Sequence, residues 1–287
     1  MEKFNIKRFA NVLKWDFMNN WKYTLWLFLV MIVVFTCMLG LTYFNNNSDY
    51  MQGVHDTMMS VQASFCSFIL SIIILAGASR MFLPLKDKQS ATAFLSLPAT
   101  NLEKFISRFL NVIVLWIVVG CVAFLCADAL QMLLAKLLGA NYVLSGSKTF
   151  FSMWPFDNME WRGDPHWVKI QIGLILTILM TYATYILGGI LFRRRQFWIT
   201  SVAIFAISVI GIIAIVNIGW AIGEWLEAHT EQFEAFMERF FKDEETFSNF
   251  LFYAWWTITG LVTVLFTWLT YRFFKRAQVI NNKFLNV

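Results

Sequence analysis

The sequence predicts an all-α, polytopic membrane protein with six membrane-spanning helices. Hydrophobic residues make up 59% of the 287 positions and charged residues 14%, and the mean hydropathy is +0.60. That composition is too apolar for an ordinary soluble domain. Six runs of roughly twenty mostly apolar residues divide the chain, each long enough to cross about 30 Å of hydrocarbon as a helix. The Lys and Arg residues between the runs concentrate in alternate loops.

The apolar runs are continuous, which favours helices over the strands of a transmembrane barrel. Barrel strands alternate apolar and polar residues over short segments, whereas residues 199–215 are apolar almost throughout. We therefore treat the chain as a single transmembrane domain. The predicted spans are residues 24–43, 60–79, 109–129, 170–191, 199–219 and 251–270.

The basic residues predict the orientation. Of the 23 Lys and Arg, 17 lie in the N-terminal arm, in the loops after the second and fourth spans, and in the C-terminal tail. Because basic residues accumulate on the cytoplasmic side, both termini are expected to be cytoplasmic. This topology also accounts for the pI of about 9.0. Nucleic acid is not an expected partner, because the basic residues are spread over four segments and form no single stripe.

Residues 1–22 precede the first span and predict an interfacial helix on the cytoplasmic surface of the bilayer. At helical spacing, apolar side chains fall on one face and basic side chains on the opposite face. Two interpretations stay open: a basic anchor held by anionic membrane lipid, and an anchor that also contacts a cytoplasmic partner. The residues expected on the apolar face include Phe9, Leu13, Phe17 and Trp21.

Residues 80–108 form the longest cytoplasmic connection, between the second and third spans. Pro84 suits a helix start, and Pro98 should end that helix near Ser96, because the residue before a proline is disfavoured in the α conformation. The segment therefore predicts a short helix across the cytoplasmic face.

The end of this connection carries a helix-start signal for the third span. Thr100 and Glu103 have the spacing of a capping box. On the short helix before them, Phe94, Leu95 and Leu97 are expected to be exposed.

The outer connections are expected to lie against or outside the membrane. About forty residues rich in aromatic side chains, Phe150 among them, join the third and fourth spans and suggest a segment at the outer headgroup layer. Residues 221–249 predict an amphipathic helix with one acidic face, which is either a solvated surface or a cation-binding one. That face consists of Glu224, Glu227, Glu231, Glu234 and Glu238.

Groups that carry chemistry are scarce. Asp128 is the main ionisable residue within a span, near the outer end, where it reaches interfacial water or Gln131. We find no Walker phosphate loop, no HExxH, no GxSxG and no Cys/His cluster with metal-ligand spacing. No catalytic residue and no metal ligand is therefore predicted, and any work against a gradient must draw energy from another polypeptide.

Two stretches at the end of the cytoplasmic loop resemble a known family. Ala93-Phe-Leu-Ser-Leu-Pro98 is followed by Leu102-Glu-Lys-Phe-Ile-Ser-Arg-Phe-Leu110, which leads into the third span. With the basic helix before the first of six spans, these stretches resemble the permease subunits of ABC-2 type ATP-binding-cassette transporters. The resemblance covers topology over the whole chain, and specific residues over 84–110. Gln89-Ser-Ala-Thr92 stands where family members often have an acidic residue and a Gly-Thr pair.

The resemblance implies an exporter subunit in a bacterial cytoplasmic (inner) membrane. In such permeases the loop between the second and third spans docks into a separate ATPase subunit, which would bind the ATP and Mg²⁺. Six spans would form half of a translocation pathway, so a second copy of this chain or a related permease is implied. The residues placed at the docking contact by position are Lys86, Asp87, Lys88, Gln89, Phe94 and Leu95, and Pro98 would fix where the helix turns toward the membrane.

Two functions of other classes stay open. One is a non-transporting membrane adaptor whose outer acidic helix recruits an envelope protein. The other is an ion-coupled carrier or channel, which the scarcity of ionisable residues within the spans disfavours. The sequence names no substrate.

Overall fold

The computed structural model describes residues 4–44, 52–86, 88–139, 143–152, 166–192, 195–230, 240–241 and 243–276. The described residues are largely helical and contain no β-strand, which confirms the all-α prediction. Six of the helices are long and apolar enough to cross a membrane. Each of the six predicted spans lies within one of them.

The described elements comprise long helices and short ones. The long ones are α1 (Ile6–Phe44), α2 (Gln52–Ser79), α5 (Leu115–Leu137), α7 (Trp167–Leu191), α8 (Gln196–Ala228) and α10 (Glu244–Arg276). The short ones are η1 (Leu83–Leu85), α3 (Lys88–Leu95), α4 (Asn101–Phe109), the π-helical η2 (Leu110–Val114) and α6 (Ser147–Ser152). The third span is therefore one continuous helical run made of α4, η2 and α5.

The N-terminal amphipathic segment is helical, as predicted, and continues into the first span without a break as α1. Phe17 and Trp21 are exposed, whereas Phe9 and Leu13 are half-buried. The side of this segment that faces the rest of the chain carries Asp16, which the amphipathic pattern did not single out.

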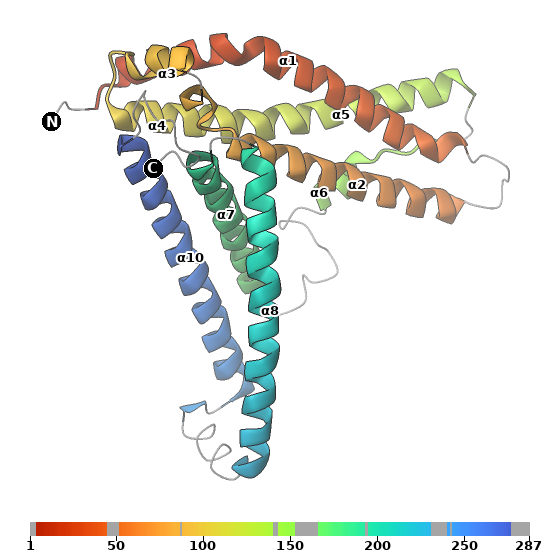
Figure 1. Cartoon of the computed structure of the whole chain (residues 1–287). Helices are drawn as coiled ribbons and strands as arrows, with labels where there is room; N and C mark the ends of the chain where they lie inside the picture. Colours follow the sequence, from red (N-terminus) through yellow and green to blue (C-terminus); the bar gives the residue numbers. More distant parts are fainter. Residues whose placement is uncertain are drawn as a thin grey trace.

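The long helices form two groups of three. Figure 1 shows α1, α2 and α5 side by side in one group and α7, α8 and α10 in the other. The groups meet near the end of the molecule that carries α3, and their far ends point in different directions. Contact between them runs mainly through α2 and α7.

The contact between the groups is close at Gly189. A Cβ atom at this position would lie 2.3 Å from the backbone oxygen of Ser79 on α2. The Gly189 carbonyl also accepts a hydrogen bond of 2.8 Å from Nε2 of Gln196 at the start of α8. Absence of a side chain at Gly189 therefore lets α2, α7 and α8 approach one another at one point.

Buried apolar side chains form two clusters. One lies within α1, α2, α5 and α6 and includes Phe35, Phe124 and Phe150. The rings of Phe124 and Phe150 stack with centroids 3.8 Å apart, so Phe150 is a core residue of this cluster. Residues 153–165 of the connection between the third and fourth spans lie outside the described residues, and the expected placement of this connection at the headgroup layer stays a prediction. The other cluster lies at the α3 end and brings together Phe94 and Phe274, which are far apart in the sequence.

Replacement of Gly189 by Ala should destabilise the chain. The new methyl group meets backbone, which cannot move aside as a flexible side chain would, and overpacking of this kind costs about 1–3 kcal/mol. Thermal unfolding of the purified chain in detergent should therefore begin at a lower temperature. Gly211→Ala is the matched control, because its Cβ meets no atom within 4 Å. Equal stability of the two variants would contradict the close contact.

Candidate functional site

The start of α4 is fastened by the predicted capping box. The Thr100 hydroxyl accepts a hydrogen bond from the Glu103 amide at 3.2 Å, and the Glu103 carboxylate accepts from the Thr100 amide at 2.8 Å. The same carboxylate accepts from the Asn5 amide at 2.7 Å and pairs with Arg8 at 3.3 Å. Glu103 therefore ties the beginning of α1 to the beginning of α4.

The helix α3 is attached to the chain by Phe94, and the expected exposure of this residue is wrong. Phe94 is only 1% exposed. Its ring lies against Trp15 of α1 and Phe274 of α10, with centroids 6.4 Å and 6.2 Å away. The physical reason is that the short helix has one apolar face, and helices from both ends of the chain are present to cover it.

A buried cation fastens the end of α3. The Lys104 ammonium donates a hydrogen bond of 2.7 Å to the carbonyl of Leu95, the last residue of α3. A positive charge at this end is favourable because the terminal carbonyls of a helix lack partners and carry partial negative charge. Phe94 and Lys104 together make α3 and α4 one rigid unit.

A buried ion pair lies beneath this unit. The Arg108 guanidinium pairs with the Asp16 carboxylate, and Asn111 donates to the other oxygen of that carboxylate. Arg108 also donates to the Met81 carbonyl at 3.0 Å, and Asn20 donates to Asp16 at 3.1 Å. The pair joins α1, the end of α2 and the third span, and both partners are almost fully buried.

A π-helical turn begins between two of these groups. Arg108 and Asn111 are three residues apart and both reach Asp16, with η2 beginning between them at Leu110. A π-helical turn holds more residues than an α-helical one and so changes which side chains share a face. Asp16, Asn111 and this turn were not predicted, although the sequence contains an acid within a basic arm and an Asn at the start of an apolar run.

The predicted docking residues divide into exposed and buried sets. Leu95 and Leu97 are half-buried, so their expected exposure, like that of Phe94, is not met. Asp87 lies outside the described residues. The exposed members are Lys86, Lys88, Gln89 and Pro98. Within α3, Thr92 and Ala93 are also exposed.

At the other end of the third span, Asp128 holds the segment that leads into α6. Its carboxylate accepts hydrogen bonds from Gln131 at 2.9 Å, the Ser145 hydroxyl at 2.6 Å, and the amides of Gly146 at 2.9 Å and Ser147 at 3.1 Å. The predicted contact with Gln131 is confirmed. Asp128 therefore positions the start of α6, and the role that fits these bonds is structural.

The predicted acidic outer face falls largely outside the described residues. Glu224 is exposed near the end of α8, and of Glu227 only the helical backbone is described. Glu231, Glu234 and Glu238 lie outside the described residues. The helix predicted over 221–249 therefore stays a prediction, apart from its first residues in α8 and its last in α10.

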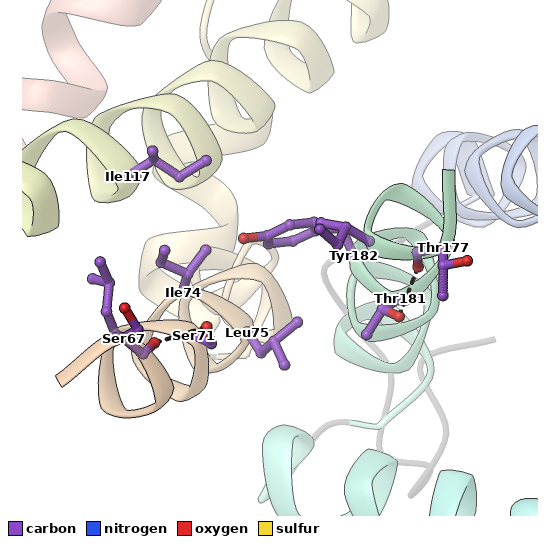
Figure 2. A pocket seen from close by; sticks show the side chains of 10 residues that line it. Ser67, Ser71, Ile74, Leu75, Ile117, Thr177, Thr181 and Tyr182 are labelled. Carbon is purple, nitrogen blue, oxygen red and sulfur yellow. Dashed lines mark hydrogen bonds between the residues drawn. The ribbon is translucent and has the colours of Figure 1, made fainter. Parts of the chain in front are cut away.

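A cleft of about 360 Å³ lies between the two helix groups, in the middle of the spans. Figure 2 shows Tyr182 reaching from α7 toward α2 and α5. Among the described residues, the Tyr182 hydroxyl has no hydrogen-bond partner, and the buried Ser67 hydroxyl has none either. No charged side chain contributes to the lining. The lining residues are Ser67, Leu70, Ser71, Ile74, Leu75, Ile117, Thr177, Ile178, Thr181 and Tyr182.

The hydroxyls that do have partners bond within their own helices. Ser71 donates to the Ser67 carbonyl at 2.9 Å, and Thr181 donates to the Thr177 carbonyl at 2.9 Å. Such bonds leave hydroxyl lone pairs available to a ligand. The cleft is thus apolar, uncharged, and supplied with a few hydrogen-bonding groups, as small-molecule sites usually are.

Asp16→Asn should strongly destabilise the chain. The substitution keeps the shape of the side chain and leaves the buried Arg108 charge without its counter-ion, which costs about 3–5 kcal/mol. Chemical or thermal unfolding in detergent measures the loss. Glu224→Gln neutralises an exposed acid and should leave stability unchanged. If Asp16→Asn were as stable as Glu224→Gln, the ion pair would not be holding these helices.

Phe94→Ala and Gln89→Ala should have different effects on stability, because Phe94 lies on the buried face of α3 and Gln89 on its exposed face. Loss of the buried ring costs about 3–5 kcal/mol, whereas a change at the exposed Gln89 should stay within about 0.5 kcal/mol. The unfolding temperatures of the two variants, and protease sensitivity of the 80–108 loop, measure the difference. A stable Phe94→Ala variant with an uncleaved loop would show that the aromatic cluster does not attach α3.

Known proteins give no guide to the function of this chain, which is therefore argued from the contacts described above. No protein family, no curated protein and no solved structure matches the chain.

Proposed function

We propose that this chain is the permease subunit of an ABC-2 type transporter that works as an exporter. It would form half of a translocation pathway, with a second copy or a related chain forming the rest. It is itself no enzyme in this proposal, and ATP and Mg²⁺ are bound by a separate ATPase subunit. The membrane concerned is the bacterial cytoplasmic membrane, with both termini inside.

The observation that carries the proposal is the construction of α3. Its exposed face is polar and bears Lys88 and Gln89, and its buried face is fixed by Phe94. A surface meant to receive force from a partner needs an accessible face and a rigid connection to the elements that move. The Lys104 bond and the Phe94 cluster supply that connection to α1, α4 and α10.

Force on α3 would change the tilt of one helix group relative to the other. The α4 helix runs directly into the third span, and α10 of the second group contacts the same aromatic cluster. All six spans must cross one slab of hydrocarbon, so the diverging groups in Figure 1 must come nearer to parallel in a membrane. Movement about the contact between Ser79 and Gly189 would open and close the cleft at Tyr182.

The cleft suggests the class of substrate. Its apolar, uncharged lining favours a neutral amphiphile, because a charged group there would lose hydration without a counter-ion. The hydroxyl of Tyr182, which reaches into the space between the helix groups in Figure 2, would bond a polar group on that molecule.

Lys88→Glu should detach the ATPase subunit and leave the permease folded. Lys88 is the first residue of α3, where an acidic side chain favours the helix, so folding should be unaffected. Charge reversal on a docking face should reduce binding about tenfold or more. The measurement is affinity purification of the chain from its native membrane in mild detergent, with identification of bound proteins and assay of ATP hydrolysis.

Lys136→Glu is the matched control, because Lys136 is exposed at the opposite end of the third span. It should retain both the ATPase subunit and the activity. Purification of the wild-type chain without any ATPase would contradict the permease assignment and favour an adaptor or a carrier. Retention of an ATPase by Lys88→Glu would contradict the docking face alone.

A further inference from the structure

A second pocket, separate from the central cleft, lies where α1, α2 and the third span meet at the α3 end of the molecule. Its volume is about 390 Å³. The side chains that line it include two guanidinium groups, two amides and two large aromatic rings. They are Asn20, Tyr23, Thr24, Arg80, Leu83, Arg108, Asn111, Val112 and Trp116, together with Gly77.

The pocket lies at a membrane boundary. Lys22, Arg80 and Arg108 stand at the ends of three apolar runs on three adjacent helices, and charged residues in such positions mark the headgroup layer. The lining residues Tyr23 and Trp116 are of the type that gathers at this depth. The pocket is therefore open to lipid headgroups.

One positive charge in the pocket is unbalanced. The Arg108 charge is cancelled by Asp16, with which it forms the buried pair. Arg80 has no acidic partner in the part of the chain that the structure describes. Its guanidinium donates to the Tyr23 hydroxyl and lies 5.5 Å from the centre of the Tyr23 ring. The pocket thus carries a net charge of +1 on a side chain that is held in place.

A second side chain with a donor group lines the same pocket. The Trp116 ring packs on Gly77, where a Cβ atom would lie 2.4 Å from the ring, and its centre is 6.2 Å from that of Tyr23. Among the described residues the Trp116 indole N–H has no hydrogen-bond partner. A fixed guanidinium and a nearby indole N–H form a donor set suited to phosphate oxygens.

We infer that this pocket binds the phosphodiester of an anionic phospholipid. A phosphodiester carries one negative charge, which matches the one unbalanced charge of the pocket. A zwitterionic lipid brings its own cation and gains less from Arg80. Basic pockets between membrane helices at this boundary are suited to such headgroups.

The surface beside the pocket favours a lipid over a soluble phosphate. Tyr23, Trp26 and Val30 follow one face of α1 at helical spacing. Trp26 is 69% exposed and Val30 is 53% exposed. An acyl chain attached to a phosphate at Arg80 would therefore continue along an apolar track toward the middle of the membrane. A bound lipid of this kind would join α1, α2 and the third span, and its binding does not depend on the proposed transport function.

The test compares phosphatidylglycerol with phosphatidylcholine of the same acyl chains, added to the full-length chain in mild detergent. Native mass spectrometry and thermal unfolding measure binding and stabilisation. Phosphatidylglycerol should bind more tightly and raise the unfolding temperature more. Arg80→Gln should weaken phosphatidylglycerol binding about tenfold and weaken phosphatidylcholine binding less, so that the preference between the two lipids is lost. Arg272→Gln, at an exposed residue near the end of α10, should keep the preference.

Trp116→Phe gives a second variant that keeps a ring on Gly77 and removes the N–H donor. It should weaken phosphatidylglycerol binding about fivefold. The inference is overturned if the wild-type chain shows no preference, or if either pocket variant retains full affinity. It is also overturned if soluble glycerol phosphate stabilises the chain as well as phosphatidylglycerol does, because the pocket would then be a site for free phosphate.

Discussion

The ion pair between Asp16 and Arg108 is the interaction on which the arrangement of the first group of helices depends. Removing two charges from water costs several kcal/mol for each ion, so the pair is stable only where other groups complete its hydrogen bonds. Asn20, Asn111 and the Met81 carbonyl do so. The first helix, the end of the second and the start of the third can satisfy these groups together in few arrangements. The pair therefore specifies the arrangement even if it adds little to net stability.

The contacts of α3 follow from this arrangement. With α1 and the third span held together, Trp15 and Lys104 are in place to receive the buried face and the last carbonyl of the short helix. Phe274 then joins the end of α10 to the same cluster. A helix of eight residues is too short to be stable alone in water. Its rigidity comes from the ordered surface beneath it, and its exposed face is therefore presented in one orientation.

Features that depend on local sequence were predictable. The six spans follow from hydropathy, and the capping box follows from the spacing of Thr100 and Glu103. Asp128 was identified as unusual, and its contact with Gln131 was foreseen. Features that depend on contacts between distant segments were not. Phe94 reads as exposed on an isolated amphipathic helix, and only the presence of Trp15 and Phe274 buries it.

The same limit applies to Asp16 and the central cleft. From the sequence alone, Asp16 is expected at the surface, because it lies in a basic arm. Its partner Arg108 is ninety-two positions later, and only the fold brings the two together. The cleft combines hydroxyl residues of α2 and α7 that are ordinary within their own helices. Ser and Thr in membrane helices usually bond their own backbone, so no pattern in one helix marks them as lining a ligand site.

The π-helical turn at Leu110–Val114 changes how the side chains of α4 are aligned with those of α5. A π-helical turn accommodates one surplus residue, and one residue corresponds to about 100° of rotation around an α-helix. The part of the helix before the turn, with Glu103, Lys104 and Arg108, is therefore rotated about the helix axis relative to its position on an uninterrupted α-helix. One helix thus combines two registers, and the face that carries these three residues is offset from the face that an unbroken α-helix would continue along α5.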